Sequence, residues 1–181
     1  MPAARQRGAT LLTSLLLLLV LTVLGLTAMQ MSRMEERMAG NTRDSTAAFE
    51  GAESALRNGE ALLRQQSARP PDCGAPPCLS SLPVWSAGAL GPIESQPASW
   101  WLPSTGNALP FTDTQGNASM SGQNTDPTLV IEHLGFVRTD GGVETGEEPP
   151  VGRDFYRITA HATGASGHAN ALLQSTYARK F

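Results

Sequence analysis

The uncharged, leucine-rich run from Ala9 to Ser32 constrains the fold of this chain more than any other sequence feature. As a helix it would extend about 36 Å at about 1.5 Å per residue. That length is enough to cross the roughly 30 Å apolar core of a bilayer. Arg5 and Arg7 precede the run, and positive charge before an apolar segment favours a cytoplasmic N-terminus. We therefore expect one membrane-spanning helix, with the chain beyond Arg33 outside the cytoplasm.

Three classes of N-terminal segment share this hydropathy: a cleaved secretory signal, a plain membrane anchor and a more specialised export leader. A secretory signal requires small residues at positions −3 and −1 of its cleavage site. Cleavage after Thr27 or after Ala28 meets this requirement poorly, and in the second case Leu26 lies at −3. The residues that flank the run must therefore distinguish a plain membrane anchor from a specialised export leader.

The basic leader Arg5-Gln6-Arg7-Gly8 ends in a glycine at the edge of the apolar run. This arrangement resembles the leader of type IV pilins and pseudopilins. In that family a prepilin peptidase cuts after the glycine on the cytoplasmic side and methylates the new N-terminus. The resemblance implies that residues 1–8 are a leader peptide, that cleavage follows Gly8, and that Ala9 becomes the first residue of the mature chain.

Two further stretches make the chain similar to the PilX family of minor pilins. Met34-Glu35-Glu36-Arg37-Met38-Ala39-Gly40-Asn41 follows the apolar run. Near the C-terminus, Phe155-Tyr156-Arg157-Ile158-Thr159-Ala160 leads to Leu173-Gln174-Ser175-Thr176-Tyr177. The resemblance covers about residues 5–64 and 153–178 and leaves the middle of the chain unmatched.

One departure from the pilin pattern lies inside the apolar run. Most pilins have a glutamate at the fifth residue of the mature chain, where this chain has Thr13. In the family that carboxylate is thought to meet the terminal amine of a neighbouring subunit, since a charge buried among apolar helices must be paired. The resemblance therefore implies a place at the filament tip, where no subunit lies ahead. The alternative is that Thr13 is an ordinary, tolerated membrane residue.

Residues 33–68 show the spacing of an amphipathic helix. We expect a bend or a local melt near Gly40, because glycine costs about 1 kcal/mol within a helix and Asn41 can cap a restarted helix. With the apolar run this makes one long helix, roughly Leu11–Ser67, which should end before the prolines at 70 and 71. Its apolar stripe comprises Met34, Met38, Ala48, Phe49, Ala52, Ala55, Leu56, Leu62 and Leu63.

The charged residues Glu35, Glu36 and Arg37 lie just beyond the apolar run. A solvated helix face outside the bilayer is one interpretation of them. The other is that they select neighbours among packed pilin helices, because charge patterns influence partner choice more than affinity. The sequence leaves both interpretations open.

Residues 69–127 are rich in Pro, Gly, Ser and Asn, and we expect an irregular, loop-rich region there. Cys73 and Cys78 are the only two cysteines, and outside the cytoplasm such a pair favours a disulfide over a metal site. Its expected role is to hold the exit of the helix. Isolated aromatic residues in this region either plug loops onto the sheet or form an exposed partner-binding patch: Trp85, Trp100, Trp101 and Phe111.

Residues 128–181 read as a small antiparallel sheet with strands at Thr128–Val137, Asp154–Thr163 and Ala169–Ala178. In the second strand apolar and polar residues alternate, as in a sheet with one packed face. Residues 164–167 would join the last two strands as a hairpin. A sheet laid against the apolar stripe buries both surfaces. We therefore expect an α+β, pilin-like fold: a long N-terminal helix, first transmembrane and then amphipathic, packed on a small antiparallel sheet.

Other site classes find little support. A formal net charge of −3 does not favour nucleic-acid binding, and no P-loop or dinucleotide fingerprint is present. No cofactor and no metal ion are expected. The acidic stretch matches no EF-hand and reads as a solvated loop, and the histidines lack metal-ligand spacing. These residues are Asp140, Glu144, Glu147 and Glu148, then His133, His161 and His168.

The resemblance implies a minor pilin of a type IV pilus that primes assembly and enters the filament with other minor pilins, the major pilin and a tip adhesin. Before assembly it would lie in the bacterial inner membrane with its C-terminal part in the periplasm. A pseudopilin of a type II secretion system shares the same features and is the first alternative. The second alternative is a membrane-anchored periplasmic binding protein or enzyme. The small apolar core expected for this chain leaves little room for the ligand pocket that such a protein needs.

Overall fold

The computed structural model describes residues 9–78, 80–112, 120–138 and 151–181. The chain divides into two compact units, residues 1–43 and residues 44–181, and we call the second unit the head. The elements are helix α1 (Ala9–Gln65), strands β1 (Asp72–Cys73) and β2 (Val84–Ser86), 3-10 helices η1 (Ile93–Ser95), η2 (Ala98–Trp101) and η3 (Pro103–Thr105), and strands β3 (Leu109–Pro110), β4 (Thr128–Arg138), β5 (Gly152–Thr163) and β6 (Asn170–Arg179).

Helix α1 is continuous through Gly40, so the predicted local melt there is wrong. The cost of one glycine is small compared with the hydrogen bonds of the turns on both sides. Thr42 Oγ1 also donates to the carbonyl oxygen of Met38 at 2.9 Å, which spans the glycine. The helix ends at Gln65, ahead of the two prolines, where the sequence predicts its end.

The three long strands β4, β5 and β6 confirm the predicted antiparallel core of the sheet. Strand β2 pairs in parallel with β4, and β1 pairs in parallel with β2, so the sheet is mixed and not purely antiparallel. These parallel strands are only two and three residues long. Such short segments show no alternation in sequence, which is why periodicity did not predict them.

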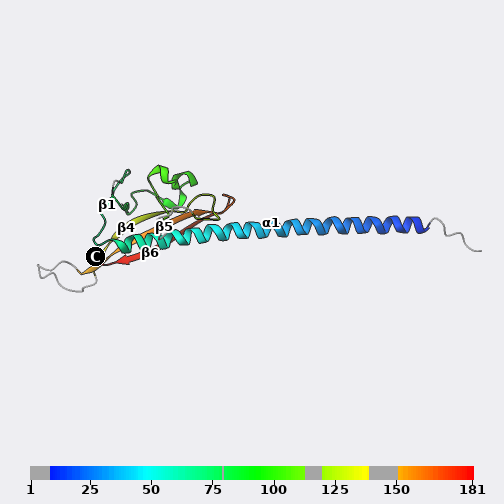
Figure 1. Ribbon diagram of the computed structural model, residues 1–181, viewed down its shortest axis with the longest axis horizontal. Coiled ribbons are helices and arrows are strands. Elements are labelled where there is room, and N and C mark those ends of the chain that lie inside the picture. The colour runs from blue at the N-terminus through cyan, green and yellow to red at the C-terminus, as the bar shows by residue number, and fades with distance from the viewer. Residues whose placement is uncertain (1–8, 79, 113–119, 139–150) are drawn as a thin grey trace, which may run out of the picture. The chain divides into compact units, whose positions relative to one another are not determined.

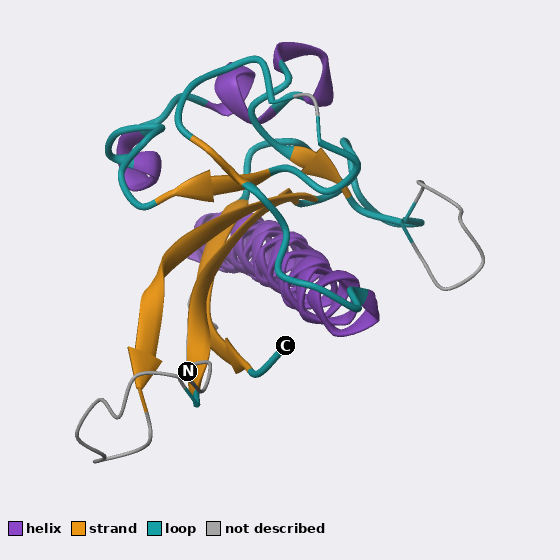
Figure 2. Cartoon of the chain, turned by 90° about the vertical axis from the view of Figure 1, so that its left-hand side faces the viewer, coloured by secondary structure: helices purple, strands orange, loops and turns teal. Residues whose placement is uncertain are grey.

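The head part of α1 packs against the sheet through very small residues. Figures 1 and 2 show β4, β5 and β6 along one side of this part of the helix. A Cβ atom at Gly59 would lie 2.8 Å from Ile158 Cγ2, closer than Cβ atoms approach other atoms. The backbone of the helix therefore lies almost directly on β5. The buried residues of α1 are Ala48, Gly51, Ala52, Ala55, Gly59 and Leu63.

Strand β4 separates two apolar clusters. Leu129 and Ile131 belong to the cluster that includes the helix, whereas Val130 between them packs with Trp85 and Trp101 on the other face. Trp85 is fully buried and Trp101 is 3% exposed. These tryptophans thus plug the irregular region onto the sheet, and the alternative of an exposed aromatic patch is wrong for both of them.

Asp44 connects the start of the head part of α1 to the turn between β5 and β6. Its Oδ1 accepts the backbone N–H of Ser166 at 2.9 Å, and its Oδ2 accepts the N–H of Ala169 at 3.3 Å. The Ser166 hydroxyl also donates to Oδ2. The approach is close, because a Cβ at Gly164 would meet the Asp44 carboxylate at 2.4 Å. The hydrogen bonds from Ser166 hold the pKa of Asp44 below its ordinary value of 3.8.

We expect this contact to weaken in acid. The pKa of Asp44 is lowered in the folded chain, so its stabilising effect is present above the ordinary value of 3.8 and is lost as the pH falls through the lower, folded pKa. In NMR spectra of the full chain in nanodiscs, the Ser166 amide proton should shift with a midpoint below 3.8. Asp44→Asn should abolish that titration, and a midpoint at or above 3.8 would contradict the assignment.

Candidate functional site

The candidate site begins with the apolar surface of α1. Large apolar side chains between Leu11 and Met31 are 44% to 72% exposed. Among the described residues, α1 is the helix long and apolar enough to cross a membrane. A contiguous apolar surface of this size requires lipid or other apolar helices around it. This surface is therefore the principal contact surface of residues 9–32.

The hydroxyl groups within this surface bond to the helix itself. Thr13 Oγ1 donates to the carbonyl oxygen of Thr10 at 3.0 Å. In the same way Ser14, Thr22 and Thr27 donate to carbonyl oxygens three residues earlier. Such bonds satisfy polar groups in an apolar environment without a partner from another chain. Thr13 thus carries neither a charge nor an unsatisfied group into that environment.

The other residues predicted to act in assembly lie on α1 or before it. Ala9 is the first residue of the helix, whereas Gly8 lies outside the described residues. Glu35, Glu36 and Arg37 are exposed. The structure therefore leaves this charged cluster accessible to solvent or to a neighbouring helix.

The disulfide expected between Cys73 and Cys78 is present, with 5.7 Å between the two Cα atoms. Cys73 lies in β1 at the end of the sheet, eight residues after α1 ends at Gln65. Both cysteines pack against the cluster that contains Trp85 and Trp101. The crosslink thus ties the chain that leaves α1 to the irregular region beside the sheet.

A buried polar cluster lies where the chain leaves the helix. His133 Nε2 lies 2.9 Å from Asp154 Oδ1, and His133 Nδ1 lies 2.9 Å from Asp72 Oδ2. Arg69 donates to Asp72 at 2.9 Å and approaches Asp154 at 3.6 Å. The side chains of His133 and Asp154 are only 6% and 7% exposed. Each buried charge therefore faces an opposite charge or a hydrogen-bonding partner, as a structural ion cluster requires.

Sequence reasoning missed this cluster and treated His133 as an ordinary strand residue. Its members come from the segment after α1, from β1, from β4 and from β5, and only the strand register brings them together. Local spacing offers one weak signal, because Arg69 and Asp72 lie three residues apart. The cluster ties the exit of the helix to the middle of the sheet.

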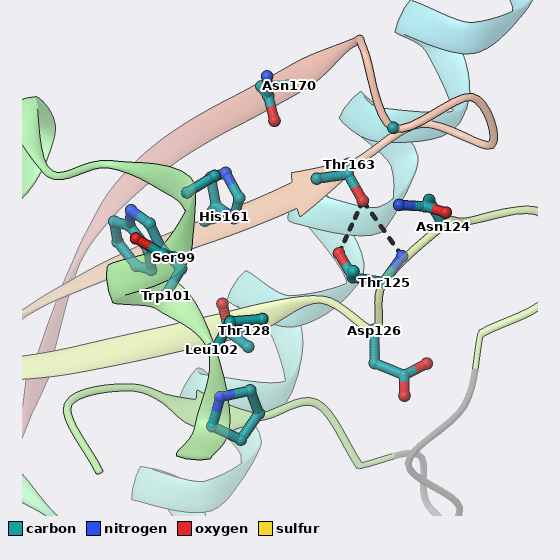
Figure 3. Close-up of a pocket in the computed structure, with 13 residues that line it drawn as sticks. Ser99, Trp101, Leu102, Asn124, Thr125, Asp126, Thr128, His161, Thr163 and Asn170 are labelled. Atoms are coloured by element: carbon teal, nitrogen blue, oxygen red, sulfur yellow. Dashed lines mark hydrogen bonds between the residues drawn. The ribbon is translucent and has the colours of Figure 1, made fainter. Parts of the chain in front are cut away.

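A hollow of about 550 Å³ opens between the η2–η3 segment, the residues before β4 and the turn from β5 to β6 (Figure 3). The ring of His161 stacks on Trp101 with 5.1 Å between ring centroids. Thr125 and Thr163 are joined by a hydrogen bond of 2.8 Å between their hydroxyls. Burial lowers the pKa of His161. In Figure 3 the carboxylate of Asp126 points away from this imidazole.

The lining of this hollow offers hydroxyls, amides, one imidazole and one carboxylate. No pair of lining side chains within the described residues joins a nucleophile to a base, which covalent catalysis requires. Across the described parts of the chain, no group of three or more His, Cys, Asp or Glu side chains is placed to hold a metal ion. The acidic residues Asp140, Glu144, Glu147 and Glu148 lie outside these parts.

Comparison with protein families gives two matches that overlap along α1. The model described as PilX N-terminal matches residues 7–57. The model described as Type IV pilus assembly protein PilX C-term matches residues 38–179, which is most of the chain. Comparisons with curated proteins and with solved structures gave no match.

The family matches agree with the architecture. Both models meet on α1, which carries the exposed apolar surface at one end and the sheet of the head at the other. A pilin with such an apolar helix is suited to membrane anchoring and to incorporation into a pilus. The family is a structural component of pili, and its members associate with other pilus components. This chain belongs to the PilX family of type IV pilus minor pilins.

Proposed function

We propose that this chain primes assembly of a type IV pilus and remains in the filament at or near its tip, with other minor pilins, the major pilin and a tip adhesin as its partners. The observation that carries the proposal is the match of both PilX family models to a chain whose apolar helix is exposed on all sides. A helix of this kind exchanges lipid for neighbouring helices without changing its own fold. The proposed action is mechanical, because the protein works by packing against neighbouring subunits and not by catalysis.

Maturation is the first step of the proposal. A prepilin peptidase removes residues 1–8 on the cytoplasmic side of the inner membrane and methylates Ala9. The helix 9–32 then spans the membrane, and the head lies in the periplasm until the subunit enters the pilus. The family match supports pilus assembly over a type II secretion filament, because both matched models describe pilus proteins.

We expect the mature chain to begin at methylated Ala9. The full-length protein is co-expressed with a prepilin peptidase and purified from membranes, and its intact mass and N-terminal sequence are measured. Gly8→Arg serves as the control and should leave the leader attached. A start near Ala28 or Met29 would indicate signal-peptidase cleavage and would exclude the filament proposal.

The place near the tip rests on Thr13. Its hydroxyl is bonded within the helix, so the residue neither needs nor offers an ionic partner at the position where most pilins have a glutamate. A subunit without that carboxylate has no means of pairing with the terminal amine of a subunit ahead of it. Such a subunit is suited to the leading end of a filament.

We expect Thr13→Glu to change minor-pilin complexes, because the new carboxylate is costly in an apolar environment unless a terminal amine pairs with it. The measurement is recovery of minor pilins with the tagged chain and the number of pili per cell. Thr13→Gln, which has a similar size without the charge, is the matched control. If both variants assemble like the unmodified chain, Thr13 does not determine position.

Partner choice rests on the charged cluster beyond the apolar run. Reversal of Glu35 and Glu36 to Lys should reduce recovery of partner pilins several-fold, and the loss should shrink at high salt, because Coulomb interactions between exposed charges are screened. Glu50→Lys, another exposed reversal on α1, is the control. Unchanged recovery after the double reversal would show that the cluster is only a solvated helix face.

A further inference from the structure

Strand β6 forms an open edge of the sheet. It is the last strand in the order β1-β2-β4-β5-β6 and pairs with β5 over its whole length, from Thr163 opposite Asn170 to Asp154 opposite Arg179. No described segment pairs with its other side. In an antiparallel edge strand every second N–H and C=O points away from the sheet. Among the described residues, no other backbone segment bonds to these groups of β6.

This edge lacks the features that usually prevent strand addition. Exposed edges are commonly protected by charged residues, proline or β-bulges. From Asn170 to Ala178 the strand contains neither a charged residue nor a proline. Its register with β5 shows no irregularity, in contrast to the shift between His133 and Gly135 in β4. The edge is therefore long, regular and uncharged.

An apolar flank accompanies the open edge. Ser175 of β6 donates to Glu60 Oε1 at 3.4 Å, which identifies the side of α1 that lies next to β6. Leu56, four residues before Glu60, lies on the same side of the helix. Leu173 and Tyr177 alternate with Ser175 and so share its face of the strand. All three apolar side chains are only partly buried against the core.

The same side of α1 also presents Phe49, seven residues before Leu56, with 51% of its surface exposed. A strand beside β6 would cover the partly buried side chains and would bond to the free backbone groups. The partly buried side chains and the open edge therefore lie along the same side of the helix. We use the name β6 slot for β6 together with Phe49, Leu56 and Glu60.

We propose that the β6 slot binds an extended segment of a different polypeptide by β-strand addition. The segment is about eight to ten residues long, with apolar residues at every second position toward α1. Glu60 is half-buried, and among the described residues it has no cationic partner. The bound segment therefore carries a basic residue opposite Ser175. This inference goes beyond the proposed function and does not depend on the position of the chain in the pilus.

A second copy of this chain fits the slot less well. Two β6 strands paired antiparallel by a two-fold axis would place the two Asp44 residues at opposite ends of the joint sheet. Asp44 is where each head continues into its own N-terminal helix. In such a pair the two N-terminal helices would begin at opposite ends of the joint sheet. The uncharged edge also supplies no base for the Glu60 of a partner copy until Arg179, at its end.

The test adds a strand directly after the C-terminal Phe181 of the full chain in nanodiscs. The turn Asn-Gly is followed by alternating Thr and Val residues, with one Lys opposite Ser175. If the slot accepts a strand, hydrogen exchange of the extension should slow at least ten-fold relative to an extension in which two Val residues are replaced by Pro. The same strand is also supplied as a free peptide at millimolar concentration, with the β6 amide resonances as readout.

Matched variants locate the bound strand. Leu173→Thr, in the slot, should reduce protection of the extension several-fold, whereas Leu172→Thr, on the other face of β6, should change it less than two-fold. Exchanging the extension's Lys for Glu should weaken protection in the unmodified chain but not in Glu60→Gln.

Fast exchange of the extension together with no response to the free peptide would overturn the proposal. A dimer of the unextended chain that Leu173→Thr dissociates would overturn the choice of a different polypeptide.

Discussion

The head depends on how closely α1 approaches the sheet. Small residues allow this approach, and at Gly59 there is no room for a Cβ atom beside Ile158. A larger side chain there would push the helix away and open gaps among the fully buried side chains of β4 and β5. Close packing of this kind is sensitive to single methyl groups. The face of the helix with the smallest side chains is thus the one that positions it.

Polar contacts hold the two ends of this packed surface. At one end the Asp44 carboxylate accepts hydrogen bonds from the turn between β5 and β6. At the other, Arg179 of β6 donates to the carbonyl oxygens of Leu63 and Gln66, where the helix ends. The cluster around His133 ties the next segment to the sheet. Apolar packing provides most of the burial, and these contacts set the position of the helix along the strands.

The sequence predicted the long elements because their signals are local. Alternation in β5, the prolines after α1 and the uncharged run each determine an element without reference to distant residues. The short parallel strands and the His133 cluster depend on register between distant segments, 47 residues apart for Trp85 and Glu132 and 61 for Asp72 and His133, for which no local pattern exists. At Gly40 the prediction failed for the opposite reason. The local free-energy cost of a glycine was given more weight than the hydrogen bonds of the helix on both sides of it. The residues of α1 that are proposed to act in assembly were inferred from the resemblance to pilins and not from the geometry of the structure.

The contacts between Asp44 and the β5–β6 turn, and between Leu63 and Arg179, join residues more than a hundred positions apart. Forming such distant contacts delays folding until the intervening chain is available. The final strand must therefore emerge before the end of α1 gains its partners, whereas the apolar segment is complete as soon as it is synthesised. A chain interrupted before the β5–β6 turn would therefore leave both ends of the packed helix without these partners, so the helix gains its final position on the sheet only when nearly all of the head has been synthesised.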